Sequence, residues 1–242
     1  MSKNLISVGS HGNNLALYKE FIDNHWLYVK VACDLKSNIL IEREYSGYAW
    51  YSKNVLMKEN LIRIHKDVFY ELIVPQFQGE KYSFEGRFHL EQDKMLQIVR
   101  FYKEKWPTNG NFAIHGDMGL SNFIFNKSEI ILIDWEHYHK SDLSYYGFDI
   151  INMLFISYCY RFRKSGHLAH SDKSFIKKCY RVLFDDFAFN SQIVDRPFYK
   201  SKIYMIKNLS KISYGNSKAN KKFELASFPD EILNQLDKYI SS

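Results

Sequence analysis

Residues 115–136 constrain the fold of this chain more than any other segment. Asp117 and Asn122 stand five positions apart in a stretch with the composition of a loop, and Asp134 follows a run of four apolar residues. Apolar runs bounded by polar turn residues are typical of short strands. We therefore predict a hairpin-like core over residues 113–134, in which the two carboxylates and the amide are held next to strands.

Asp117, Asn122 and Asp134 are the residue types that phosphoryl transfer from ATP requires. One carboxylate orients the acceptor hydroxyl and takes its proton, while an amide and a second carboxylate hold Mg²⁺ on the phosphates. Mg²⁺ prefers oxygen ligands. We assign Asp117 as the candidate catalytic base, and Asn122 and Asp134 as the candidate Mg²⁺ ligands. Each residue alone is equally typical of a turn, so the prediction depends on finding all three in order.

Lys30 lies inside an apolar run that predicts a strand, where it is a candidate for binding the phosphates of a nucleotide. The competing interpretation is an exposed strand residue. A phosphate-binding lysine needs a carboxylate to orient it, and we choose Glu44 on the following predicted helix, with Glu42 as the alternative. These two residues lie on different faces of a helix, so at most one of them points at Lys30.

Gly9 and Gly12 belong to a turn-rich segment that could cover phosphates with its backbone N–H groups. Two glycines at this spacing are a weak signal, and an ordinary hairpin turn explains them as well. Residues 75–79 could bind adenine through their backbone. His115 is predicted to orient the loop rather than to act as an acid or base, and Asp149 is predicted to cap the helix that follows it.

The order of predicted elements changes near residue 80. Strands are predicted within residues 5–32, 60–66 and 69–77, and helices over residues 37–53, 84–106, 149–164, 172–189, 197–212 and 229–241. This order predicts an α+β protein with two lobes. Residues 1–79 would form a small, antiparallel, β-rich nucleotide-binding lobe. Residues 80–242 would form a larger, mainly helical lobe that carries the catalytic loop and the acceptor site.

The charge and the cysteines narrow the classes of partner and compartment. A net charge of +6 suits an anionic ligand such as a nucleotide, but Lys and Arg are scattered without a groove-reading motif, so we expect no nucleic-acid partner. Cys33, Cys159 and Cys179 form neither a disulfide framework nor a zinc site. The sequence has no signal-peptide pattern and no apolar run long enough to span a bilayer. We expect a cytoplasmic protein, and peripheral proximity to a membrane stays open.

The motifs resemble those of the aminoglycoside phosphotransferase and choline kinase family, a branch of the protein-kinase-like fold. Its catalytic loop, His-Gly/Asn-Asp-x-x-x-x-Asn, is matched by residues 115–122, and its metal motif, Ile-Asp-Trp/Phe-Glu/Gly, by residues 133–136. A downstream Asp before a helix is matched by Asp149. These specific motifs cover about residues 113–150, and the order of the predicted lobes extends the resemblance more weakly over nearly the whole chain.

The resemblance implies an ATP- and Mg²⁺-dependent kinase in which Asp117 is the base, Asn122 and Asp134 bind Mg²⁺, and Lys30 holds the phosphates. The interval between Asp134 and Asp149 leaves little room for a long activation segment, which favours a small-molecule acceptor over a protein. Candidate acceptors are choline or ethanolamine, an aminoglycoside, and a sugar or glycan. The alternatives are a protein kinase of the same fold and a nucleotide-binding scaffold without turnover.

The acceptor would be recognised by side chains of matching charge. A cationic acceptor favours carboxylates and aromatic faces, for which the candidates are Glu136, Asp142, Tyr145, Tyr146, Asp185 and Asp186. A neutral or anionic glycan favours the basic helices after residue 160, for which the candidates are Arg161, Arg163, Lys177, Lys178 and Arg181. The net positive charge favours the second class slightly over strongly cationic aminoglycosides.

Overall fold

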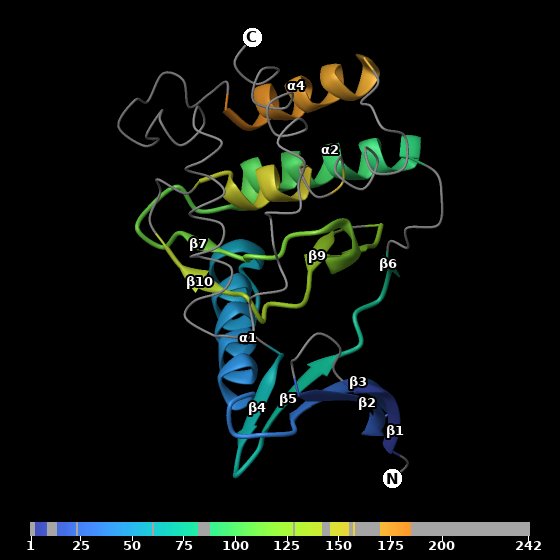
Figure 1. Cartoon of the computed structure of the whole chain (residues 1–242), viewed down its shortest axis with the longest axis vertical. Coiled ribbons are helices and arrows are strands. Elements are labelled where there is room, and N and C mark those ends of the chain that lie inside the picture. Colours follow the sequence, from blue (N-terminus) through green and yellow to red (C-terminus); the bar gives the residue numbers. More distant parts are fainter. Residues whose placement is uncertain are drawn as a thin grey trace.

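Five antiparallel strands form a sheet from the N-terminal third of the chain (Figure 1). They are β1 (Lys3–Val8), β2 (Leu15–Ile22), β3 (His25–Ala32), β4 (Arg63–Lys66) and β5 (Tyr70–Pro75), in the spatial order β1-β2-β3-β5-β4. The structure, a computed structural model, describes residues 3–8, 14–22, 24–59, 61–81, 88–127, 129–141, 146–154, 157 and 170–184. The predicted strands of this region are confirmed, because apolar and aromatic runs between turn residues marked them clearly.

Helix α1 (Asn38–Tyr51) lies between β3 and β4 in the chain and confirms the helix predicted over residues 37–53. It continues into a π-helical turn, η1 (Ser52–Leu56). Gly47 lies in the middle of α1, where a Cβ atom would stand only 2.6 Å from the Cβ of Trp135. The absence of a side chain at this position therefore lets α1 lie directly against the segment that follows Asp134.

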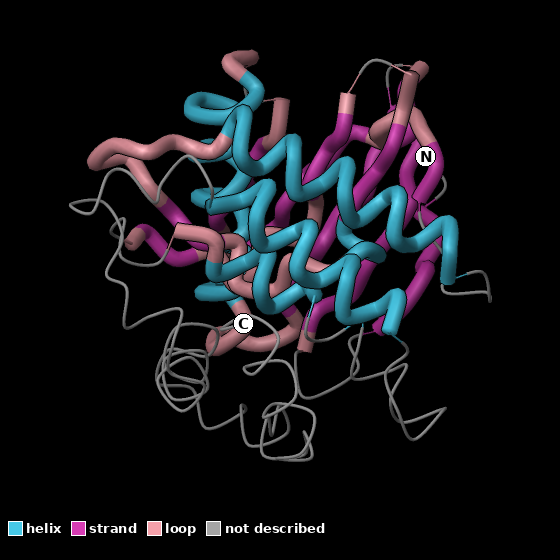
Figure 2. Tube along the Cα trace, turned by 90° about the horizontal axis from the view of Figure 1, so that it is seen from above, coloured by secondary structure: helices cyan, strands magenta, loops and turns pink. Residues whose placement is uncertain are grey.

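Two long helices lie at the opposite end of the molecule from the N-terminal sheet (Figure 1). Helix α2 (Phe88–Lys105) and helix α4 (His170–Phe184) run side by side in both views (Figure 2). They match the helices predicted over residues 84–106 and 172–189. A further helix covers residues 148–154. The predicted helices 197–212 and 229–241 lie outside the described residues. None of the helices in the described ranges has the length and apolar character needed to cross a membrane.

The segment that carries the sequence motifs contains several short strands. Strands β6 (Glu80–Lys81), β8 (Phe123–Phe125) and β9 (Ile130–Leu132) form a three-stranded sheet, and β7 (Ala113–Ile114) pairs with β10 (His139–Lys140). The β8–β9 hairpin confirms the hairpin-like core, although β7 pairs outside it. Gly79 has φ +143°, and a Cβ there would stand 2.6 Å from the Phe125 carbonyl oxygen. Glycine is needed at this position for β6 to reach β8.

Trp135 is the centre of the aromatic core around this segment. Its side chain is fully buried, and its ring centroid lies 5.1 Å from that of Tyr51, 5.8 Å from Trp50 and 6.1 Å from Trp106. The imidazole of His115 meets it edge-on at 4.6 Å. Aromatic contacts of this kind add to the free energy gained by burial. The residue next to Asp134 is thus fixed in the core by α1, by the end of α2 and by the loop after β7.

Candidate active site

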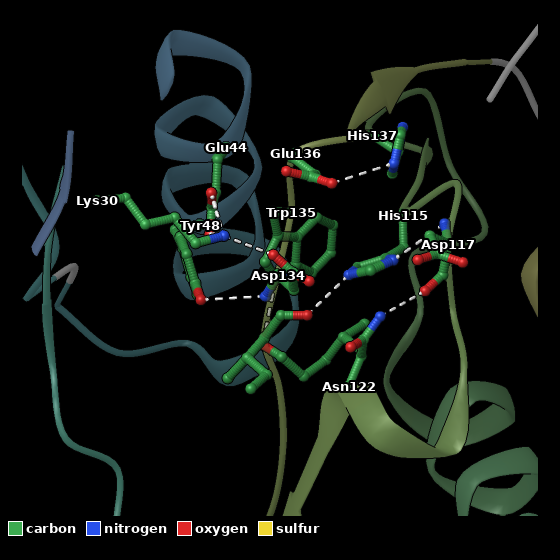
Figure 3. A network of polar contacts seen from close by, with 12 residues as sticks. Lys30, Glu44, Tyr48, His115, Asp117, Asn122, Asp134, Trp135, Glu136 and His137 are labelled. Atoms are coloured by element: carbon green, nitrogen blue, oxygen red, sulfur yellow. Dashed lines mark hydrogen bonds and ion pairs between the residues drawn. The ribbon is translucent and has the colours of Figure 1, made fainter. Parts of the chain in front are cut away.

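Lys30 on β3 contacts α1 and also the segment after β9, which lies 104 residues later in the sequence at Asp134. Its ammonium group donates to both carboxylate oxygens of Glu44 on α1, at 2.8 and 3.0 Å, and to Oδ1 of Asp134 at 2.6 Å (Figure 3). The Glu44 side chain is 1% exposed, that of Lys30 19% and that of Asp134 38%. The exposed side of this cluster is therefore the carboxylate of Asp134, while the Glu44 contact is enclosed.

The partner of Lys30 is Glu44, and the alternative Glu42 points elsewhere. Glu42 forms an ion pair with Lys66 on β4, on a different face of α1. Both side chains of that pair are about half exposed, so the pair adds little to stability. Glu44, in contrast, lies on the buried face of α1 that meets β3.

Charge compensation sets the protonation of the cluster. Burial alone would lower the pKa of Lys30, but Glu44 and then Asp134 raise it well above its usual range. Lys30 in turn is the main reason why the pKa of Asp134 falls to about 2. Burial raises the pKa of Glu44 to about 7, with Lys30 acting in the opposite direction. At neutral pH the cluster presents a cationic amine beside an ionised, partly exposed carboxylate.

His115 links this cluster to the loop that carries Asp117 and Asn122. The backbone N–H of Asp117 donates to Nδ1 of His115 at 3.3 Å, so the ring proton is on Nε2, which donates to the carbonyl of Ile133 at 3.0 Å. Burial lowers the pKa of His115 to about 4, so the ring is neutral at pH 7. The orienting role predicted for His115 agrees with these contacts. One imidazole holds the segments that carry Asp117 and Asp134 in fixed positions relative to each other.

The side chain of Asn122 folds back onto the backbone of Asp117. Its side-chain amide nitrogen donates to the backbone carbonyl of Asp117 at 2.8 Å, which leaves its side-chain oxygen as the atom able to bind a cation. Gly116 has φ +87°, and a Cβ there would stand 2.6 Å from the His137 carbonyl oxygen. Burial raises the pKa of Asp117 above its usual range. The loop thus holds a carboxylate with raised basicity next to a side-chain amide.

Asp149 does not have the role predicted from the sequence. Instead of capping the helix over residues 148–154, its two carboxylate oxygens accept hydrogen bonds from the backbone N–H groups of His115 and Gly116, both at 2.9 Å. Asp149 is fully buried, and burial raises its pKa to about 7. The prediction was wrong because the partners lie more than thirty residues earlier, where no local pattern could reveal them.

The cluster of Lys30, Glu44 and Asp134, with Glu136 beside it, brings several carboxylate oxygens together. Carboxylate oxygens of Glu44, Asp134 and Glu136 lie within 4.8 Å of one another. Carboxylates and amide oxygens are the ligands that Mg²⁺ prefers, so the donors present here and on Asn122 fit such an ion. The sequence pointed to Glu136 only as a candidate for acceptor binding.

The structure arranges the predicted residues in two adjoining groups. Asp134 lies with Lys30 and Glu44, and Asn122 lies with Asp117. The predicted phosphate-covering residues Gly9 and Gly12 lie outside the described residues. So do several acceptor candidates, namely Asp142, Tyr145, Arg161, Arg163, Asp185 and Asp186.

Of the acceptor candidates that the structure describes, Tyr146 is fully buried, with its ring 5.3 Å from that of Tyr102. It cannot offer a face to a cationic acceptor. Lys178 and Arg181 are exposed on α4, and Lys177 is half-buried there.

A cavity of about 440 Å³ opens beside the Lys30 cluster. Leu17, Tyr28, Val74 and Ile133 contribute apolar surface to its lining, while Lys30, Glu44 and Asp134 line it as well. Such a cavity, mainly apolar with a few convergent polar groups, is typical of a small-molecule site.

No protein-family model and no curated protein matches this chain. Among solved structures it is similar to WaaP in complex with acyl carrier protein, with a TM-score of 0.50 at 9% sequence identity, over 93% of this chain and 90% of that chain. At this identity the likeness supports a kinase-like fold and no finer statement.

Proposed function

We propose that this chain is an ATP- and Mg²⁺-dependent phosphotransferase that phosphorylates a hydroxyl group. The observation that carries the proposal is the position of Lys30 between Glu44 and Asp134, with all contacts between 2.6 and 3.0 Å. The three residues come from β3, α1 and the segment just after β9. A phosphate-binding lysine with its orienting carboxylate is what ATP-dependent transfer requires. The kinase-like fold supports the same conclusion.

Each residue has a role that follows from its chemistry. Lys30, oriented by Glu44, would contact the phosphates of the nucleotide, and Asp117 would orient the acceptor hydroxyl and accept its proton. Asp134 and Asn122 would hold Mg²⁺, which neutralises charge on the phosphates. Burial raises the pKa of Asp117, which strengthens its carboxylate as a base.

The nucleotide base would occupy the apolar part of the 440 Å³ cavity, between Tyr28 and Ile133. Tyr28 lies two residues before Lys30 on β3, so its ring is on the same face of the sheet as the phosphate-binding amine. The backbone N–H of Gln76 is already bonded to the carbonyl of Trp26 at 3.0 Å. A backbone N–H that donates to the base would therefore come from Phe77 or Gln78 rather than from Gln76.

The acceptor we propose is a small molecule: choline or ethanolamine, a sugar or glycan, or an aminoglycoside. The motifs at residues 115–122 and 133–136 support membership of the aminoglycoside phosphotransferase and choline kinase family. In that arrangement residues 1–79 would be the nucleotide-binding lobe, with Gly9 and Gly12 over the phosphates, and residues 80–242 would be the lobe that binds the acceptor.

A transfer assay tests this function. The protein is incubated with γ-labelled ATP and Mg²⁺ in separate reactions with amino-alcohols, sugars and glycans, aminoglycosides, and a generic protein. We expect transfer to one small-molecule class, and a loss of at least about 10²-fold in Asp117→Asn because general base catalysis contributes that much. Asp93→Asn is the matched control, since Asp93 is an exposed carboxylate on α2. Its activity should equal that of the wild type.

The outcomes separate the alternatives. Label on the generic protein alone would favour a protein kinase. Nucleotide binding without transfer to any class would favour a non-catalytic scaffold. Full activity of Asp117→Asn would refute the role of Asp117 as the base.

A further inference from the structure

One face of α1 packs along the segment that runs from β9 to Asp134. Glu44, Tyr48 and Tyr51 are spaced by four and three residues, so they lie on the same side of the helix. Tyr51 donates through its hydroxyl to the carbonyl of Ile130 at 3.3 Å and accepts from the N–H of Leu132 at 3.2 Å. These two bonds attach α1 to the body of β9.

The Tyr48 hydroxyl makes the corresponding contact one step further along the chain. It accepts a hydrogen bond from the backbone N–H of Asp134 at 3.2 Å (Figure 3). Tyr48 is 4% exposed, and burial followed by the Glu44 carboxylate raises its pKa far above its usual range. The hydroxyl therefore stays a neutral phenol at any working pH, and water has little access to replace it.

Asp134 needs such a contact because its backbone is in an unfavourable conformation. Its φ is +69°, in the left-handed region that residues other than glycine rarely adopt. Strand β9 ends at Leu132, two residues before Asp134. Residues in such conformations persist only when their surroundings hold them there, and they are concentrated at functional sites.

We propose that Tyr48 is a positioning residue for the cation-binding carboxylate. By holding the N–H of Asp134, it keeps the left-handed conformation in which the Asp134 carboxylate lies against Lys30. Because Glu44 and Tyr48 share one face of α1, the helix positions both partners of Lys30 together. This inference deepens the proposed function and rests on it.

Tyr48→Phe tests the inference because it keeps the ring and removes only the hydroxyl. A neutral buried hydrogen bond corresponds to about a two- to tenfold change in an equilibrium constant. If this change lowers the population of the left-handed conformation by the same factor, the apparent affinity for the cation falls in proportion. Calorimetric titration of a non-hydrolysable ATP analogue at several Mg²⁺ concentrations should show this two- to tenfold weakening, with binding in EDTA unchanged.

Tyr51→Phe is the matched control. It removes a buried phenol hydroxyl from the same face of α1, but one that contacts β9 rather than Asp134. We expect it to lower the melting temperature and to leave the Mg²⁺ dependence of nucleotide binding as in the wild type. An equal shift in both variants would overturn the inference, since it would indicate general loosening of α1.

Amide hydrogen exchange is a further readout that keeps the test decisive. The amide hydrogen of Asp134 should exchange slowly in the wild-type protein and at least twofold faster in Tyr48→Phe, with Tyr51→Phe unchanged. Fast exchange in the wild type would overturn the inference even if Tyr48→Phe folds poorly.

If the wild type binds the nucleotide with Mg²⁺ and Tyr48→Phe has the same Mg²⁺ dependence, the inference fails alone. If the wild type shows no Mg²⁺-dependent nucleotide binding, the proposed function fails and the inference with it.

Discussion

Replacing Gly47 with alanine measures how closely α1 must approach the site. The new Cβ atom would stand 2.6 Å from Cβ and 2.8 Å from Cε3 of Trp135, and 2.9 Å from Cβ of Tyr138. Two of these three atoms are Cβ carbons, whose positions are set by the backbone, so a change of rotamer cannot move them away. Either α1 or the segment that follows Asp134 must shift.

Two opposing contributions decide the size of the effect. In an unobstructed helix interior, replacing glycine by alanine stabilises by about 1 kcal/mol. Forcing extra atoms into a filled core costs about 1–3 kcal/mol and occasionally more. Because backbone must move here, we expect the upper part of that range and a net destabilisation of about 1–2 kcal/mol. For a chain of this size that lowers the melting temperature by about 2–8 °C.

Thermal unfolding followed by circular dichroism measures the change, and nucleotide binding with Mg²⁺ should weaken with it because Trp135 is next to Asp134. Gly110→Ala is the control, since a Cβ at Gly110 meets nothing within 4 Å and should change stability by no more than about 0.5 kcal/mol. A melting temperature of Gly47→Ala equal to or above that of the wild type would show that helix propensity dominates, and would refute the close approach.

Three further changes test the electrostatics of the site. Lys30→Met should abolish phosphate transfer, and chemical denaturation should show it losing stability from pH 6 to pH 8 more steeply than the wild type. Burial already raises the pKa of Glu44 to about 7, and without its cation this pKa rises further. Because the pKa is higher in the folded than in the unfolded chain, the free energy of unfolding falls as the pH rises toward the folded-state pKa. Asp149→Asn should cost about 1.5–3 kcal/mol in urea denaturation, because the carboxylate that accepts from His115 and Gly116 loses one acceptor oxygen; unchanged stability would contradict this. Burial lowers the pKa of His115 from 6.5 to about 4. This shift contributes roughly 3 kcal/mol to the free energy of unfolding above pH 6.5, and the contribution is lost as the pH falls to about 4. His115→Gln should remove this pH dependence.

Patterns along the chain were sufficient to predict several strands and helices of the described residues. The strands before residue 80 and helices α1 and α2 were predictable because alternation and helical spacing reflect local backbone geometry. Asp117, Asn122 and Asp134 could be selected as candidates because their spacing within residues 115–136 is a local property. The same holds for Lys30 on its apolar strand.

Contacts between distant segments were not predictable in this way. Asp149 looked like a helix cap, yet it binds the backbone before Asp117. Glu136 looked like an acceptor residue, yet its carboxylate lies with those of Glu44 and Asp134. Tyr48 carried no signal, because its partner is 86 residues away.

The sequence alone determined which residue types the site contains, which strands and helices carry them, and the class of chemistry that they suit. Only the tertiary structure decided that Lys30 pairs with Glu44 rather than Glu42, and that Asp134 takes a left-handed conformation held by α1. The physical reason is the range of the interactions. Backbone propensities act over a few residues and can be read along the chain. Charge pairing, burial and hydrogen bonding depend on which surfaces meet when α1 packs against Trp135 and β9.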